Sequence, residues 1–138
     1  RKGFYDFLPA NELNEAPFVA TVATQAAYTQ GHQWREQMIE YVENNINYVI
    51  GEIPRLIPGI KASLPQASFL VWLDCRGLKD AGIGDIPGFF TDAGLALNNG
   101  AMFGPGGEGF MRLNAACPRT VLERAVDLLY SHYRRVTS

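Results

Sequence analysis

The residues with the clearest capacity for chemistry lie at positions 107–119, Gly-Glu-Gly-Phe-Met-Arg-Leu-Asn-Ala-Ala-Cys-Pro-Arg. The pattern predicts a tight glycine turn, a short strand that carries one arginine, and a helix that opens at Pro118. Because strand side chains alternate between two faces, Arg112 shares the more polar face with Phe110 and Asn114. A guanidinium presented there can bind a carboxylate through two parallel hydrogen bonds, which a lysine cannot reproduce. The residues therefore favour carboxylate binding.

On the residues alone, an alternative interpretation of this arginine stays open. Arginines on strands commonly form solvated or internal ion pairs and bind no ligand. Asn114 either supports Arg112 or hydrogen-bonds to the backbone. Arg119, on the exposed opening turn of the next helix, is expected to be a surface residue rather than a substrate contact.

Three segments carry a resemblance to one group of enzymes. They are residues 26–34 followed by a long helix with Glu-Asn-Asn at 43–45, residues 66–74, and residues 109–119. Taken in this order, they resemble the C-terminal part of aminotransferase-like, fold-type I enzymes that depend on pyridoxal phosphate (PLP). Within that group they are most similar to the carbon–sulfur lyase branch related to cystathionine β-lyase. The resemblance extends from about Asn11 to the end of the chain.

The resemblance implies roles for individual residues. An amino-acid substrate would bind through its α-carboxylate to Arg112, and a complete enzyme would eliminate a sulfur group from its β-carbon. Phe103 and Gly104 would lie in a loop beside the mouth of the active site, with Asn114 as a candidate support. An aminotransferase is the alternative, since these segments do not separate elimination from amino transfer. A stand-alone, non-catalytic module that binds carboxylates or a partner is the second alternative.

The resemblance also implies that the cofactor is held outside this chain. In the group, PLP forms a Schiff base with a lysine in a Ser-x-x-Lys setting, upstream of the matched segments. The chain's lysines, Lys2, Lys61 and Lys79, have no such setting. We therefore expect no catalytic residue here, no PLP bound to this chain alone, and a large domain of the same polypeptide as its partner. The complete enzyme is expected to be a cytoplasmic homodimer, and this part alone is expected to self-associate.

Composition excludes several other classes of function. The chain has 138 residues, of which 47% are hydrophobic and 19% charged, which is typical of a globular domain. Its formal charge of -2 gives no electrostatic basis for nucleic-acid binding. No apolar run approaches the roughly 20 residues that a membrane helix needs. Cys75 and Cys117 are expected to be free thiols, and their separation from His32 and His132 predicts no metal site.

The predicted elements form an α+β fold with a small, mainly antiparallel sheet and helices packed on one face, as in the small domain of the PLP-dependent aminotransferase fold. Residues 1–15 are interpreted as an interdomain connector and residues 16–138 as the domain. Trp34 is expected to pack in the core or at the domain edge. Helical periodicity and punctuating prolines and glycines predict helices at 17–31, 33–54, 86–93 and 118–135. Apolar runs predict strands at 95–97, around 110, and at 67–74, the last covered on both faces.

Overall fold

The structure is a computed structural model that describes residues 1–11 and 17–138. It divides into two units, Arg1–Met38 and Ile39–Ser138, and each is described by itself. Part of the predicted connector, residues 12–15, and the predicted boundary at residue 16 lie outside the described residues.

The first unit is helical and exposes much of its apolar surface. It contains α1 (Lys2–Ala10), α2 (Phe18–Gln30) and the first turns of α3 (His32–Leu56). Helix α2 follows Pro17 and ends at Gly31, as the sequence predicts, and neither α1 nor α2 has a buried residue. Trp34 is 69% exposed, so the expectation that it packs in a core is wrong for this chain.

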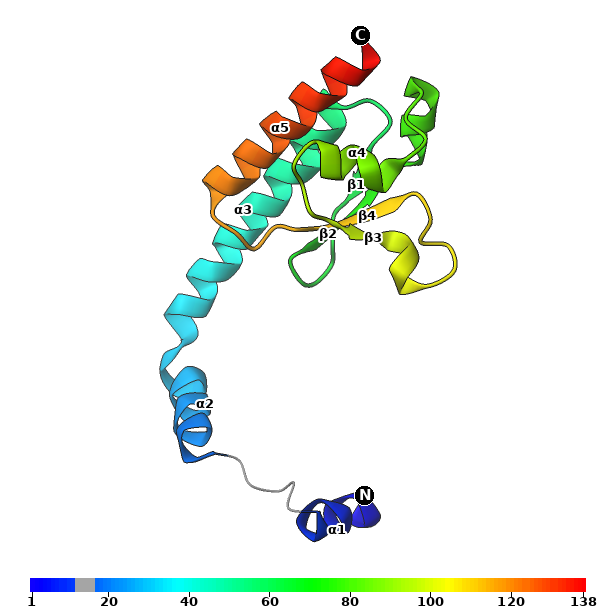
Figure 1. Ribbon diagram of the computed structural model, residues 1–138. Coiled ribbons are helices and arrows are strands. Elements are labelled where there is room, and N and C mark those ends of the chain that lie inside the picture. Colours follow the sequence, from blue (N-terminus) through cyan, green and yellow to red (C-terminus); the bar gives the residue numbers. More distant parts are fainter. Residues whose placement is uncertain (12–16) are drawn as a thin grey trace. The chain divides into compact units, whose positions relative to one another are not determined.

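The second unit contains a four-stranded antiparallel sheet with the order β1-β2-β4-β3 (Figure 1). Its strands are β1 (Lys61–Ser63), β2 (Leu70–Asp74), β3 (Asn98–Asn99) and β4 (Phe110–Asn114). The short helix α4 (Ile86–Asp92) and the long helix α5 (Arg119–Thr137) complete it, with 3₁₀ turns η1 (Arg76–Ala81) and η2 (Gly100–Phe103). The predicted α+β class is confirmed.

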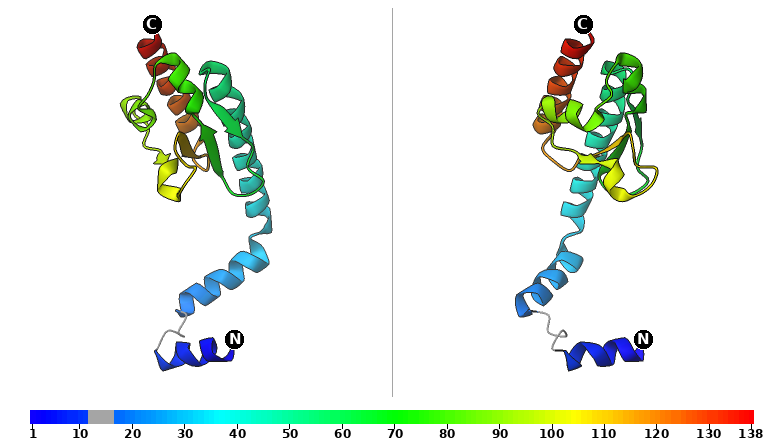
Figure 2. Two further views of the ribbon diagram at one scale, coloured as in Figure 1. Left: turned by 90° about the vertical axis from the view of Figure 1, so that its right-hand side faces the viewer. Right: turned by 45° about the vertical axis from the view of Figure 1, so that its right-hand side comes forward.

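The core of this unit lies on one side of the sheet, where α3 and α5 run side by side (Figures 1 and 2). Inward-pointing residues of β2 and β4 meet apolar residues of both helices, and each large side chain buried in this way contributes about 1.5–3 kcal/mol. The central members are Val49, Ile53, Val71, Leu73, Met111, Leu113, Leu122, Val126 and Leu129.

One buried asparagine fixes the junction between β4 and α5. Asn45 of α3 is 1% exposed, and its amide nitrogen donates to the carbonyl oxygens of Ala115 at 2.9 Å and Cys117 at 2.8 Å. These carbonyls follow the last residue of β4, where the chain leaves the sheet and has no strand partner for them. Asn45 thereby sets where β4 ends and where α5 starts relative to α3.

Two strand predictions need correction. Strand β2 begins at Leu70 rather than 67, and its alternating burial shows that described residues cover one face only. The predicted strand 95–97 is wrong: the strand forms at 98–99, while Leu95 is buried in the core and its N–H bonds to Phe90 O. The apolar side chain of Leu95, just after α4, packs in the core, and the residue does not pair within a strand. Helix α3 continues two residues past Pro54, where the sequence predicts its end.

Candidate functional site

Arg112 lies in the middle of β4, on the side of the sheet that no described helix covers. Its neighbours across the sheet are Trp72 of β2 and Asn98 of β3. Met111 and Leu113, on either side of it in the chain, are 2% and 3% exposed and point into the core. The predicted alternation of faces is confirmed, and it places the guanidinium on the helix-free face.

Neutral groups surround the guanidinium of Arg112. Its Nη2 donates to Oδ1 of Asn98 at 2.8 Å, and its guanidinium carbon lies 4.5 Å from the centre of the Phe103 ring. Its Nε is buried and has no hydrogen-bond partner among the described residues. Within residues 1–11 and 17–138, Arg112 forms no ion pair. Its charge and part of its donor capacity therefore remain for an anionic ligand.

Three aromatic rings form a wall beside this arginine. Trp72 stacks on Phe110, with ring centres 5.5 Å apart and planes at 18°, and meets Phe103 edge-on at 5.8 Å. Such pairs contribute about 0.5–1.5 kcal/mol each beyond the area they bury. The wall makes the surroundings of the guanidinium apolar on one side, which strengthens an ionic hydrogen bond formed there.

The loop between β3 and β4 brings Phe103 to this position. Asn99 Oδ1 accepts the Ala101 N–H at 3.1 Å and caps η2, the turn that ends at Phe103. Gly100 and Gly107 pack backbone against backbone. The contact leaves no room for a side chain, since a Cβ on Gly100 would lie 2.3 Å from Gly107 O. Gly104 follows Phe103 with φ +117°, a conformation that favours glycine. The two candidate loop residues thus lie in a well-defined turn.

Asn114, the candidate support for Arg112, has another partner. Its Oδ1 accepts the N–H of Ala116 at 2.8 Å, and its side chain is exposed. The hydrogen-bond partner of Arg112 is Asn98, which the sequence analysis did not single out. A strand at 95–97 does not include Asn98, the residue that pairs with Arg112 across the sheet. Placing the strand two residues later would have put a polar side chain beside the guanidinium.

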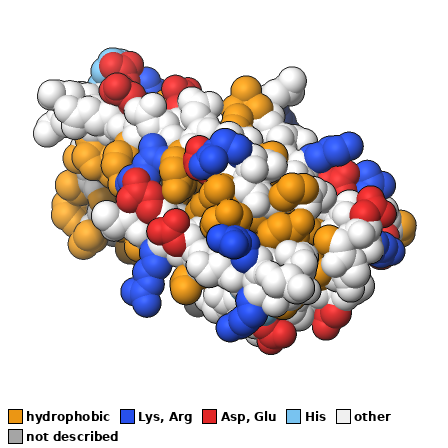
Figure 3. Space-filling model, turned by 90° about the horizontal axis from the view of Figure 1, so that it is seen from above, with side chains coloured by type: hydrophobic (Ala, Val, Ile, Leu, Met, Phe, Trp, Pro, Cys, Tyr) orange, Lys and Arg blue, Asp and Glu red, His pale blue; other side chains and the backbone are white. Residues whose placement is uncertain are grey.

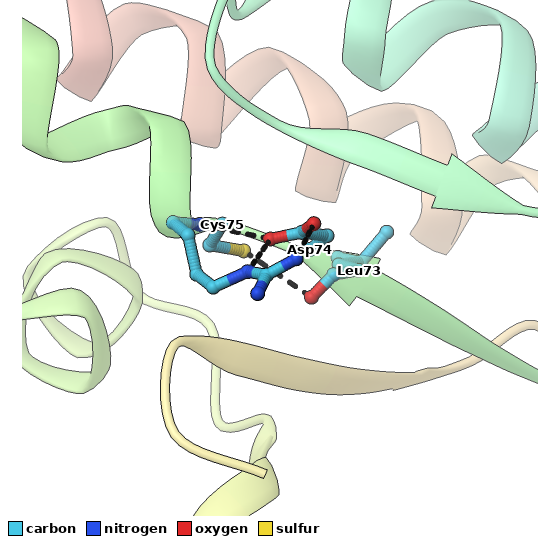
Figure 4. A network of polar contacts seen from close by, with 4 residues as sticks. Leu73, Asp74 and Cys75 are labelled. Carbon is cyan, nitrogen blue, oxygen red and sulfur yellow. Dashed lines mark hydrogen bonds and ion pairs between the residues drawn. The ribbon is translucent and has the colours of Figure 1, made fainter. Parts of the chain in front are cut away.

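A second arginine occupies the other end of the same face. The Arg76 guanidinium donates from Nε to Oδ1 of Asp74 at 2.9 Å and from Nη2 to Oδ2 at 2.8 Å. Figure 4 shows Asp74 in this network, at the end of β2 beside Cys75. The hydrogen bonds from Arg76 lower the pKa of the Asp74 carboxyl below its ordinary value. The guanidinium carbon of Arg76 also lies 4.8 Å from the Phe110 ring centre.

Arg119 has contacts within the fold rather than with a candidate ligand. Its N–H donates to the hydroxyl of Tyr41 at 2.7 Å, and its Nη2 donates to Asn44 O at 2.9 Å. Its guanidinium carbon lies 4.6 Å from the Tyr48 ring centre. These contacts join the start of α5 to α3.

The cysteines have no features of nucleophiles. Burial raises the pKa of the Cys75 thiol to about 12, and its Sγ donates weakly to Leu73 O at 3.6 Å. Burial also raises the pKa of Cys117. Both therefore stay protonated near neutral pH. Among the described residues, no three His, Cys, Asp or Glu side chains come close enough together to hold a metal ion.

On the face shown in Figure 3, Lys and Arg side chains are interspersed with Asp and Glu side chains rather than gathered into a basic field. In the described part of the chain, no helix combines the length and the apolar character required to cross a membrane.

Comparison with known proteins identifies relatives. No family model matches the chain. Cystathionine β-lyase PatB of Bacillus subtilis (strain 168) is 37% identical over 125 residues, which are 89% of this chain and 32% of PatB. Protein MalY of Escherichia coli (strain K12) is 32% identical over 124 residues, 90% of this chain and 32% of MalY. The chain is similar to one part of each of these two proteins. It therefore spans about a third of the length of the curated relatives it matches.

Solved structures support the same relationship. The PLP-bound C–S lyase from Staphylococcus hominis superposes with a TM-score of 0.83 at 26% identity, over 96% of this chain and 36% of the lyase. The fold and the resemblance to C–S lyases expected from the sequence are both confirmed. The PLP-containing solved structures that this chain matches are about three times as long as this chain.

The described residues do not by themselves fit PLP. A Schiff-base lysine has to stand beside an acid for the pyridine nitrogen and donors for the phosphate. Lys61 is exposed on an outer strand opposite Asp74, whose carboxylate already binds Arg76, and Lys79 is exposed in η1. The residues around Arg112 fit the carboxylate of a substrate instead.

Proposed function

We propose that this chain is the substrate-carboxylate-binding domain of a PLP-dependent carbon–sulfur β-lyase of the cystathionine β-lyase type. The rest of the protein supplies the cofactor and its lysine. One observation carries the proposal: Arg112 lies on the helix-free face of the sheet, with an amide and an aromatic ring as neighbours and without an acidic partner among the described residues. Homology to C–S lyases supports it.

In this function the chain's residues bind and orient. Arg112 holds the α-carboxylate of an amino acid in two charge-assisted hydrogen bonds and thereby fixes the direction of the bonds at the α-carbon. Trp72 and Phe103 shield that ion pair from water on one side. A PLP group bound in the remainder of the protein would supply the electron withdrawal at the α-carbon that loss of the α-proton and of the β-sulfur group requires.

The proposal also covers the partners of the domain. The helix-free face of the sheet meets the large domain of the same polypeptide, and the complete protein is a cytoplasmic homodimer. Exposed apolar residues on α1 and α2, such as Phe7 and Phe18, support burial of this surface in a larger protein. Light scattering of the complete protein measures the oligomeric state directly, and a monomer would remove this part of the proposal.

The deciding experiment uses the complete protein that contains this chain. With L-cystathionine, we expect release of pyruvate, ammonia and homocysteine in equal amounts. Arg112→Lys is expected to lower kcat/KM about a hundredfold, since it keeps the charge but loses the two-pronged contact, worth about 3 kcal/mol. Arg124→Lys, on the exposed side of α5, is the matched control and is expected to keep full activity.

Other outcomes would redirect the proposal. Transfer of the amino group to a 2-oxo acid without pyruvate release would identify an aminotransferase instead. A reading frame with no upstream Ser-x-x-Lys segment would leave a carboxylate-binding module without catalysis. Full activity of Arg112→Lys would remove the assigned role of Arg112 even in an active lyase.

A further inference from the structure

Two residues from one short segment hold the guanidinium of Arg112. Asn98 Oδ1 accepts a hydrogen bond from its Nη2 at 2.8 Å, and its central carbon lies over the Phe103 ring, 4.5 Å from the ring centre. Resting on the proposed carboxylate-binding role of Arg112, we propose that Asn98 and Phe103 are positioning residues that hold the guanidinium ready for the substrate while leaving its charge unneutralised.

Phe103 restricts the arginine without using its hydrogen-bond donors. A ring stacked on a guanidinium contacts its face, whereas a carboxylate binds along its edge. A free arginine side chain has many rotamers, and fixing one of them before the ligand arrives removes an entropic cost from binding. The Phe103 ring also contacts Trp72 edge-on, with ring centres 5.8 Å apart.

Asn98 contributes a neutral hydrogen-bond acceptor at a position where an acidic side chain would compete with the substrate for Arg112. Its amide oxygen accepts one hydrogen bond from Nη2, and the unpartnered Nε remains beside it. A carboxylate in the same place would form an internal ion pair like the one between Asp74 and Arg76. That pair would compete directly with the substrate. The choice of asparagine therefore keeps one positive charge available.

Both positioning residues depend on the same local structure. Asn98 is in β3, Phe103 ends η2, and the two elements are consecutive. The cap from Asn99 and the contact between Gly100 and Gly107 fix the path of the chain between them. A single segment thus sets the direction of the guanidinium from two sides.

The first test exchanges the neutral acceptor for a charged one of the same shape. In the complete protein, Asn98→Asp is expected to lower kcat/KM at least tenfold, mainly by raising KM, because the new carboxylate occupies the arginine. If Asn98 served only the fold, the isosteric aspartate would keep the hydrogen bond and the activity. Asn47→Asp, which adds the same charge on an exposed position of α3, is the control.

The second test removes the ring. Phe103→Leu is expected to lower kcat/KM about tenfold. Phe103→Tyr, which keeps an aromatic ring, is expected to keep most of the kcat/KM of the unsubstituted protein. In an Arg112→Lys background, Phe103→Leu should cost less than threefold, because a residue that acts through Arg112 loses its effect when the arginine is gone. An equal loss in both backgrounds would overturn the positioning role.

A third measurement separates this inference from the proposed function. In the complete protein labelled with ¹⁵N-arginine, the Nε–H signal of Arg112 is assigned by its loss in Arg112→Lys. We expect Phe103→Leu and Asn98→Asp to move this signal, with Phe103→Tyr close to the unsubstituted chain. An unmoved signal in both variants overturns the inference. If the signal moves but Arg112→Lys keeps full activity, the contacts stand and the carboxylate-binding role falls.

Discussion

Each end of the helix-free face has an arginine packed on a phenylalanine ring, but only one of the two arginines forms an ion pair with an acid among the described residues. At one end Arg76 lies over Phe110, and at the other Arg112 lies over Phe103, with similar distances of 4.8 and 4.5 Å. The Arg76 guanidinium forms an ion pair with both oxygens of Asp74. Arg112 instead meets the neutral amide of Asn98.

With the role proposed for Arg112, the packing of an arginine against a ring does not decide what the arginine does. A ring beneath the guanidinium orders the side chain in both places. The group that accepts hydrogen bonds from the guanidinium determines whether its charge is neutralised within the fold or remains available for a ligand. An acid two residues from Arg76 in the chain makes a local ion pair, whereas Arg112 depends on a neighbour 14 residues away that only the sheet brings near.

The largest expected effect comes from removing each guanidinium in turn. Arg112→Met should lower kcat/KM of the complete protein about a hundredfold, because about 3 kcal/mol of ionic hydrogen bonding to substrate is lost. Arg76→Met should stay within about threefold, since its hydrogen bonds end within the fold. Steady-state kinetics with L-cystathionine measures both. Equal losses would mean that the two ends do not differ in function.

A second variant tests whether the hydrogen bonds of Asn45 stabilise the end of β4 that carries Arg112. Asn45→Ala should lower the free energy of unfolding by about 1–3 kcal/mol, because it leaves the carbonyls of buried Ala115 and part-buried Cys117 without the Asn45 donor. Asn44→Ala, one residue earlier and exposed, is the control. Chemical denaturation followed by circular dichroism gives the difference.

The same variant should loosen the two ends of the β2–β4 pair unequally. Ala115 N–H donates to Phe69 O near Arg112, and Cys75 N–H donates to Gly109 O near Arg76, both at 2.9 Å. Asn45→Ala should accelerate amide hydrogen exchange at Ala115 more than at Cys75. Equal acceleration at both sites would show that the sheet opens as one unit.

The smallest effect concerns pH. Asp74 has a lowered pKa in the folded protein, so its pair with Arg76 stabilises the fold above the ordinary carboxyl pKa of about 4 and loses this contribution as pH falls through the folded value. Asp74→Asn should be destabilised by under about 1 kcal/mol at pH 7, because the pair is partly exposed. The difference from the unsubstituted chain should shrink below pH 4. A difference that persists at pH 2 would contradict this account.

The features predicted correctly from sequence are those set by local patterns. Helix α2 lies between Pro17 and Gly31, α4 and α5 lie close to their predicted bounds, and β4 has the predicted alternation. Proline, glycine and periodic apolar residues act over a few positions, so their effect can be inferred from the chain.

The errors arise where distant segments meet. Apolar Leu95 is typical of a strand, yet it packs behind α4, and the polar pair at 98–99 forms the strand because β4 offers it backbone partners. The same cause hid Asn98 from the candidate site. The roles assigned to Arg112, Asn114, Phe103 and Gly104 stay predictions, although their positions on the helix-free face and its loop are now defined.

The mutual contact of Gly100 and Gly107 has a consequence for redesign of the loop. Since each backbone fills the space that a side chain of the other would need, both positions are closed to substitution by any larger residue. Met102, between them in the chain, is 67% exposed. A library in this loop should therefore keep both glycines, whereas Met102, whose Sδ accepts a hydrogen bond from Asn98 Nδ2 at 3.6 Å, is varied only with the effect on Asn98 measured beside it.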